Sequence, residues 1–137
     1  MHESLVFEVV LPLPYEKAIP AVEDAFKMEG FGFLTHIDVK TVFKEKLNEE
    51  FRPFSIIGVC KPTLANRLLT VEPKMGLLLP CKVTVEVADE DNSKVRIINP
   101  QNMMVLGFSD NPEIELVVEE AESSIRRVLK ALEGLNV

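Results

Sequence analysis

The sequence lacks the residue patterns by which most enzymes are identified. It contains no glycine-rich nucleotide loop, no nucleophile elbow and no pair of carboxylates at catalytic spacing. Its 137 residues include two cysteines and two histidines, but no CxxC or HxxxH spacing that would supply a zinc ligand set. The sequence therefore assigns no reaction, no metal and no cofactor, and it leaves open whether the protein is an enzyme.

Long hydrophobic runs and a targeting segment are also missing. The apolar runs are far shorter than the roughly 20 residues that a membrane-spanning helix needs. The N-terminal stretch has no basic region and reaches Pro12 and Pro14 too early for a signal peptide. We therefore expect a cytoplasmic protein with no membrane partner. In a reducing compartment its two cysteines are free thiols, ligands or catalytic groups rather than a structural disulfide.

The chain contains fewer basic than acidic residues. The chain has 15 Lys and Arg against 22 Asp and Glu, which gives a formal net charge of -7. Because nucleic-acid affinity comes largely from basic side chains that neutralise phosphates, we predict no nucleic-acid partner. A hydrophobic content of 47% in 137 residues is typical of a globular chain that buries its own core. We therefore expect a single domain over residues 1–137.

Hydrophobic periodicity predicts alternating strands and helices in the order β-α-β-α-β-α-β-β-α. The predicted segments are residues 4–11, 15–29, 31–39, 42–50, 54–60, 63–71, 77–87, 94–99 and 112–132. This order predicts an α/β (α+β) fold, a single compact domain with a mixed sheet. The segment between residues 60 and 77 is long enough for a crossover, so the strands that carry the cysteines are either parallel or antiparallel neighbours.

Two segments depart from regular patterns. Pro80 interrupts the predicted strand 77–87, which indicates an edge strand or a bulge. Residues 103–108 are strongly apolar without a clear period, so they cover the core, line a pocket or contact another subunit. The run 54–60 is apolar apart from Ser55, which predicts a strand buried on both faces if the sheet is parallel or covered.

Cys60 is the first candidate site residue. It ends a predicted strand directly before a helix that starts near Pro62, where the helix dipole favours an anion. A lowered thiol pKa is therefore expected, and Lys61 adds a cation beside it. The alternative is that Cys60 is a small buried apolar residue at a strand end, which is a common role of free cysteine.

Cys81 is the second candidate, and alone it is most simply a core residue. Together with Cys60 it allows a thiol pair that cycles through a disulfide, which requires Cα atoms within about 7 Å. The pair also allows ligation of a soft metal with help from Met103, Met104 or His36. The sequence does not decide among these alternatives.

His36 and Asp38 lie two residues apart on a predicted strand and therefore on one face. They form a candidate ligand pair or an oriented acid and base. The other histidine, His2, is close to the terminus. A surface or half-buried strand histidine without a chemical role is the simpler alternative.

Three blocks of the sequence carry a resemblance to a known family. These blocks are GFGFLTHIDV, FRPFSIIGVCKPTLANRLL and EPKMGLLLPCKV, followed by a methionine-bearing segment and a terminal helix that opens with NPE. Together they resemble the bacterial and archaeal family called domain of unknown function 302. The resemblance implies a compact α/β fold that is typically dimeric and has no established activity. The family often has Asn after the first cysteine, whereas this chain has Lys61.

Three functions follow as hypotheses. The first is a noncatalytic homodimeric domain that binds a small molecule or an ion near Cys60, Lys61, Cys81, His36 and Asp38. The second is a thiol-dependent enzyme or redox sensor that uses Cys60 and Cys81. The third is a homo-oligomeric interaction module that uses the surface of residues 103–108.

Overall fold

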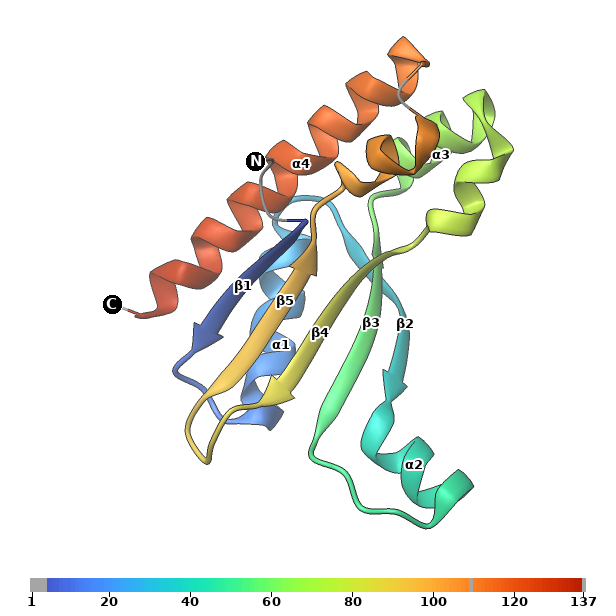
Figure 1. Ribbon diagram of the computed structural model, residues 1–137. Helices are drawn as coiled ribbons and strands as arrows, with labels where there is room; N and C mark the ends of the chain where they lie inside the picture. Colours follow the sequence, from blue (N-terminus) through green and yellow to red (C-terminus); the bar gives the residue numbers. More distant parts are fainter. Residues whose placement is uncertain (1–4, 109, 137) are drawn as a thin grey trace.

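The computed structural model describes residues 5–108 and 110–136 (Figure 1). Its strands and long helices follow the predicted order, and three short helical segments, η1 to η3, are added. The elements are β1 (Val6–Leu11), α1 (Tyr15–Lys27), β2 (Gly32–Asp38), α2 (Val39–Leu47), β3 (Phe54–Cys60), α3 (Pro62–Val71), η1 (Pro73–Leu78), β4 (Cys81–Val87), β5 (Ser93–Ile98), η2 (Met104–Phe108), α4 (Pro112–Glu133) and η3 (Gly134–Asn136). The predicted α+β fold class is confirmed.

The five strands form one sheet in the order β1-β5-β4-β3-β2, and every pair of neighbours is antiparallel. The expected mixed sheet is therefore wrong. The segment between β3 and β4 does not cross over the sheet: α3 and η1 leave it and return at the same end (Figure 1). The strands that carry the two cysteines are consequently antiparallel neighbours, and Val59 pairs directly with Cys81.

Helices α1 and α4 cover one face of this sheet (Figure 1). The core lies between them, because alternate residues of each strand point toward the helices. Its fully buried side chains include Leu11, Val22, Phe26, Ile57, Val83, Ile97, Ile114 and Ile125. Helix α3 packs against α4 and η1 beyond the ends of β3 and β4. Helix α2 follows β2 at the opposite end of the sheet (Figure 1).

Local sequence signals explain where the helices begin and end. The side chain of Asn111 accepts hydrogen bonds from the backbone N–H groups of Glu113 and Ile114, which caps the start of α4. Pro112 occupies the first turn, where a missing N–H costs nothing. Helix α1 is followed by Gly30, whose φ of 86° is in the left-handed region that suits glycine.

Two expectations about strands are wrong in detail. Pro80 does not mark an edge strand, since β4 lies between β3 and β5 and begins only after the proline. The irregular strand is instead β2, an edge strand whose register shifts between Phe33 and Thr35. Simple alternation predicts that Phe33 and His36 lie on different faces of the sheet. The bulge instead places both on the helix-covered face, where Phe33 pairs with Val59 and His36 pairs with Ile57.

Helix α2 also differs from the prediction. The segment 42–50 was expected to be helical, whereas the helix spans Val39–Leu47. An amphipathic helix ordinarily turns its apolar residues toward a core, but Val42 and Leu47 are exposed, and only Val39 of this helix is buried. The helix lies at the end of the sheet with no helix layer over it (Figure 1). No described helix is both long and apolar enough to span a bilayer.

Candidate functional site

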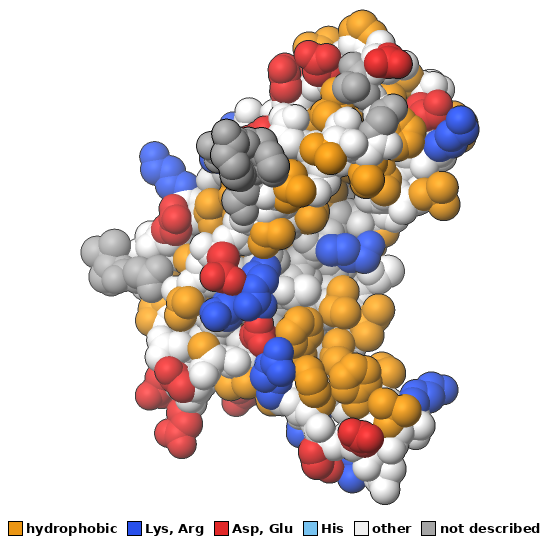
Figure 2. Space-filling model, viewed as in Figure 1, with side chains coloured by type: hydrophobic (Ala, Val, Ile, Leu, Met, Phe, Trp, Pro, Cys, Tyr) orange, Lys and Arg blue, Asp and Glu red, His pale blue; other side chains and the backbone are white. Residues whose placement is uncertain are grey.

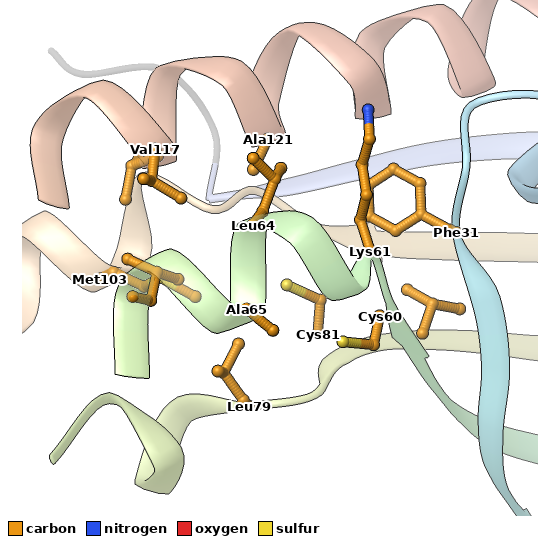
Figure 3. Close-up of a pocket in the computed structure, with 13 residues that line it drawn as sticks. Phe31, Cys60, Lys61, Leu64, Ala65, Leu79, Cys81, Met103, Val117 and Ala121 are labelled. Carbon is orange, nitrogen blue, oxygen red and sulfur yellow. The ribbon is translucent and has the colours of Figure 1, made fainter. Parts of the chain in front are cut away.

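Two adjoining cavities lie where β3 ends and β4 begins. The inner cavity, of about 30 Å³, is lined by Phe31, Val59, Cys60, Lys61, Leu64, Ala65, Leu68, Leu79, Cys81, Met103, Val117, Val118 and Ala121 (Figure 3). The outer cavity, of about 210 Å³, is lined by Leu78, Cys81, Ile98, Asn99, Pro100, Asn102, Met103 and Leu106. Cys81 and Met103 line both cavities, so they form the wall between the two.

The fold brings the two cysteines to the inner cavity. Val59 is paired with Cys81 across the strands, and Cys60 is the next residue of β3. Adjacent strand residues normally point to opposite faces, but Cys60 is the last residue of its strand and the chain turns at Lys61 into α3. Figure 3 shows both side chains directed into the space beneath α3. Both thiols are free; Cys60 is half-buried and Cys81 is buried.

The environment of the cysteines favours the protonated thiol. Burial raises the pKa of Cys60. Burial, and then the proximity of Cys60, raise the pKa of Cys81 to about 11, although the charge of Lys82 acts in the opposite direction. The expected lowering of the Cys60 pKa is therefore wrong. Helix α3 does begin at Pro62, but the Cys60 side chain points into the apolar cavity (Figure 3).

Lys61 contributes its hydrocarbon stem to the inner cavity and directs its ammonium group away from it. The Nζ atom donates to the Ser124 hydroxyl of α4 at 3.1 Å and lies 5.8 Å from the centre of the Phe31 ring. Figure 3 shows this amine pointing toward α4 rather than toward the thiols. The expected pairing of Lys61 with a Cys60 thiolate is therefore absent from the described part of the chain.

His36 and Asp38 lie away from this site. His36 is opposite Ile57 on β3, and its Nε2 atom is 2.7 Å from the hydroxyl of Ser55, which also bonds Tyr15. Asp38 caps α2 by accepting from the N–H of Thr41. The Ser55 side chain is fully buried, and its hydroxyl joins Tyr15 of α1 to His36 of β2. His2, the other histidine, lies outside the described residues.

The candidate metal ligands are only partly gathered. Met103 lines both cavities, whereas Met104 is a half-buried residue that packs against the core. Within residues 5–108 and 110–136, no three His, Cys, Asp or Glu side chains form a group that could hold a metal ion. A zinc site with four protein ligands is therefore not formed here by these residue types.

The sequence did not predict a further feature: within residues 5–108 and 110–136, no helix covers the face of the sheet opposite α1 and α4. This face carries an apolar groove of about 360 Å³, lined by Ile37, Val39, Val42, Phe43, Phe51, Phe54 and Ile56. Figure 2 shows hydrophobic side chains gathered over β2, β3 and α2 on this face. The sequence feature that could have indicated this apolar surface is the run of largely apolar residues in β3. In an antiparallel sheet with one open face, the outward residues are ordinarily polar.

An ion-pair network borders this apolar groove. The carboxylate of Glu86 accepts hydrogen bonds from Arg52 and Arg96, with Arg52 Nε at 2.7 Å, and Arg96 also pairs with Glu8. Burial by itself raises the pKa of Glu86, but the hydrogen bonds from Arg96 and Arg52 outweigh it and lower the pKa below its ordinary value. These ion pairs link the side chains of Arg52, Glu86, Arg96 and Glu8 across the middle of the open face, beside the apolar groove.

These features define a class: a single-domain α+β protein with helices on one face of an antiparallel sheet and a thiol-lined cavity at its end. The chain matches the family described as Domain of unknown function DUF302 over residues 7–132, and it belongs to that family. The resemblance inferred from the cysteine blocks is thus confirmed.

Two relatives extend the comparison. An uncharacterised protein of Aquifex aeolicus (strain VF5) is 24% identical over 142 residues, and the match covers 93% of this chain and 96% of that protein. The crystal structure of an uncharacterised conserved DUF302 protein from Bacillus stearothermophilus is similar with a TM-score of 0.77 and 26% identity. The match covers 96% of this chain and 98% of the other. Neither relative carries an assigned activity in its name.

Proposed function

We propose that this protein is a noncatalytic binding domain whose outer cavity takes a compact, largely apolar small molecule. The observation that carries this proposal is the outer cavity itself. Its wall is mostly hydrophobic, and its polar residues are Asn99 and Asn102. The Asn102 amide nitrogen donates to the carbonyls of Leu5 and Asn99, and Asn99 Oδ1 accepts from the N–H of Gln101, so these bonds hold the two polar residues in place. Small-molecule sites combine an apolar lining with a few polar groups that orient the ligand. At about 210 Å³ the cavity is smaller than a drug-sized site, so the ligand is correspondingly small.

The alternative of a thiol-dependent enzyme is less well supported. A cysteine nucleophile or redox sensor needs an accessible thiolate at neutral pH. Here the pKa of each cysteine is raised, and Cys81 is buried. Because the thiols of Cys60 and Cys81 are mostly protonated at neutral pH, they fit the wall of a binding cavity better than the role of a nucleophile.

The outer cavity is tested with cyclohexanol, an apolar ring with one hydroxyl group. Methyl-labelled protein is titrated with it and followed by NMR. We expect saturable shifts of the Leu78, Ile98 and Met103 methyl groups. Leu106→Trp fills the cavity and abolishes the shifts. Val105→Trp is the matched control, because Val105 is equally exposed on η2 (67% against 62%) but lines none of the cavities described above. Linear, non-saturating shifts, or equal binding by both variants, would count against the proposal.

We also propose that the protein forms a homodimer through the open face of the sheet. Ile37 is 48% exposed beside the half-buried Phe54 and Ile56, so no described segment covers the apolar strand β3 on this side. A second copy is the partner that this face fits, because two-fold contacts pair one patch with itself and apolar residues then meet apolar residues. Residues 103–108 fit this role less well, since of the large apolar side chains there only Val105 and Leu106 are exposed, whereas Met103 is buried and Met104 and Phe108 pack against the core.

The dimer is tested by sedimentation equilibrium. We expect the wild-type protein to sediment as a dimer at micromolar concentration, and Ile37→Lys to weaken association by about tenfold or more, because a lysine cannot lose its hydration inside the contact. Leu116→Lys on α4 is the matched control, since Leu116 has a similar exposure of 53% on the helix side. A monomeric wild-type protein, or an unchanged Ile37→Lys dimer, would refute this arrangement.

A further inference from the structure

The inner cavity is lined by two thiols, and Met103 adds a thioether to its wall. Cys60 and Cys81 both line it. Because Val59 pairs with Cys81 and Cys60 follows Val59, strand geometry sets the Cα atoms of the two cysteines about 6 Å apart. The remaining wall is apolar apart from the stem of Lys61. In the described part of the chain no further His, Cys, Asp or Glu joins the two thiols to complete a larger ligand set.

We propose that the inner cavity binds one Cu(I) ion between the sulfur atoms of Cys60 and Cys81. Soft thiolate ligands select Cu(I), and this monovalent ion is stable with two thiolates alone. Zinc, in contrast, is almost always held by four ligands in structural sites. The number and kind of ligands in this cavity therefore favour the monovalent ion.

The size of the cavity and its access agree with an ion. Its volume of about 30 Å³ exceeds the roughly 10–15 Å³ that one water molecule requires, so the cavity has room for an ion. Cys60 is only half-buried, which leaves an entry path to the first ligand. Cys81 is buried behind it, so that transfer to the second sulfur takes the ion out of solvent.

The binding reaction balances without an oxidant. Two neutral thiols and one Cu(I) give a bis-thiolate complex with one negative charge, and two protons are released to solvent. Copper stays in the +1 state and both sulfur atoms stay reduced. Lys82, which follows Cys81 in β4 and bonds the carbonyl of Pro80 at 3.0 Å, is a cation whose charge acts on the Cys81 sulfur. It partly offsets the charge of the complex.

The site extends the proposed function rather than depending on it. Small-molecule binding uses the outer cavity, and Cys81 and Met103 are the residues common to both cavities. A disulfide between the two cysteines would compete with the ion, because Cα atoms about 6 Å apart are within the range that a disulfide bridges. The test is therefore carried out on the reduced protein without oxygen.

The experiment is a competition for Cu(I) between the full-length reduced protein and the chelator bicinchoninate. Variants Cys60→Ser and Cys81→Ala remove one ligand each, and Cys81→Ala keeps the buried position apolar. Met28→Leu is the control, because Met28 is a sulfur-bearing residue that is 80% exposed and lines neither cavity. Circular dichroism verifies that each variant is folded. The readouts are copper per chain, the ultraviolet thiolate-to-copper absorption and protons released in weakly buffered solution.

We expect one Cu(I) per chain, two protons released per ion, and a loss of affinity of about 100-fold or more in each cysteine variant but not in Met28→Leu. The proposal is overturned if the wild-type protein does not compete with the chelator, if either folded cysteine variant keeps wild-type affinity, or if one ion is shared by two chains. The copper competition and the cyclohexanol titration are both carried out on the wild-type protein, which separates the two sites. Failure to bind copper with cyclohexanol binding retained rejects only the ion site, and the reverse result rejects only the small-molecule site.

Discussion

Gly58 of β3 lies where Pro80 packs against the sheet, and replacing it with alanine tests that packing. A β-carbon at Gly58 would be 2.3 Å from the Thr35 hydroxyl oxygen and 2.6 Å from Cγ of Pro80. Both distances are far below ordinary contact. Since Pro80 directly precedes Cys81, the geometry at Gly58 helps to set where β4 and the thiol cavity begin.

The cost of Gly58→Ala follows from which neighbour can move. Thr35 is an exposed residue of the edge strand, and its side chain can rotate at a cost of roughly 0.5–1.5 kcal/mol. The Pro80 ring is part of the backbone, so the chain itself must shift, which costs about 1–3 kcal/mol for an overpacked site. The lower entropy of the unfolded alanine chain offsets about 0.5–1 kcal/mol. We expect a net destabilisation of about 2 kcal/mol, or roughly 6–8 °C in Tm for a domain of this size.

Urea denaturation measures this difference, and Gly32→Ala provides the matched control. Gly32 is also a strand glycine next to the site, paired with Cys60, but a β-carbon there meets nothing within 4 Å. We expect Gly32→Ala to lie within about 0.5 kcal/mol of the wild-type protein or to be slightly more stable. We expect the double variant Gly58→Ala/Thr35→Ala to regain the part of the stability that the clash with the Thr35 side chain costs. If Gly58→Ala is as stable as Gly32→Ala, Pro80 does not pack on β3 as described.

The remaining predictions concern buried polar groups and the thiols. Because its folded-state pKa is depressed, ionised Glu86 stabilises the fold above the ordinary carboxyl pKa, and this stabilisation is lost as pH falls through the lowered value. Glu86→Gln should therefore cost about 1–2 kcal/mol at neutral pH and remove part of the acid dependence measured by urea denaturation at several pH values. Ser55→Ala should cost about 1–2 kcal/mol, since the hydroxyl is buried and bonds both Tyr15 and His36. Iodoacetamide at neutral pH should alkylate Cys60 more slowly than a model thiol, and Cys81 only when the protein unfolds, because both pKa values are raised.

Each of these predictions has a defined contrary result. An unchanged pH profile in Glu86→Gln would mean that the carboxylate is not held by Arg52 and Arg96 in solution. Wild-type stability of Ser55→Ala would mean that its hydrogen bonds are replaced without loss. Alkylation of Cys60 faster than the model thiol would show a lowered pKa, and it would restore the thiol-enzyme hypothesis.

Much of the local structure could be predicted from the sequence, because it depends on neighbours in the chain. The strand 54–60 and the order of all long elements follow from hydrophobic periodicity, and the start of α4 follows from Asn111 and Pro112. Prediction failed where a distant segment decides the outcome. The bulge in β2 shifts His36 to the covered face, and Val42 and Leu47 of α2 stay exposed because no described helix lies over them.

The sequence alone determined that Cys60 ends a strand and comes directly before a helix. Only the tertiary structure decided what that position means chemically. Antiparallel pairing of β3 with β4 brought Cys81 beside Cys60. The start of α3 by itself predicted a lowered pKa for the Cys60 thiol. Burial between the apolar side chains of α3 and α4 instead raised the pKa of both thiols. Solvation depends on what surrounds a side chain in space, and this environment is set by segments far away in the chain.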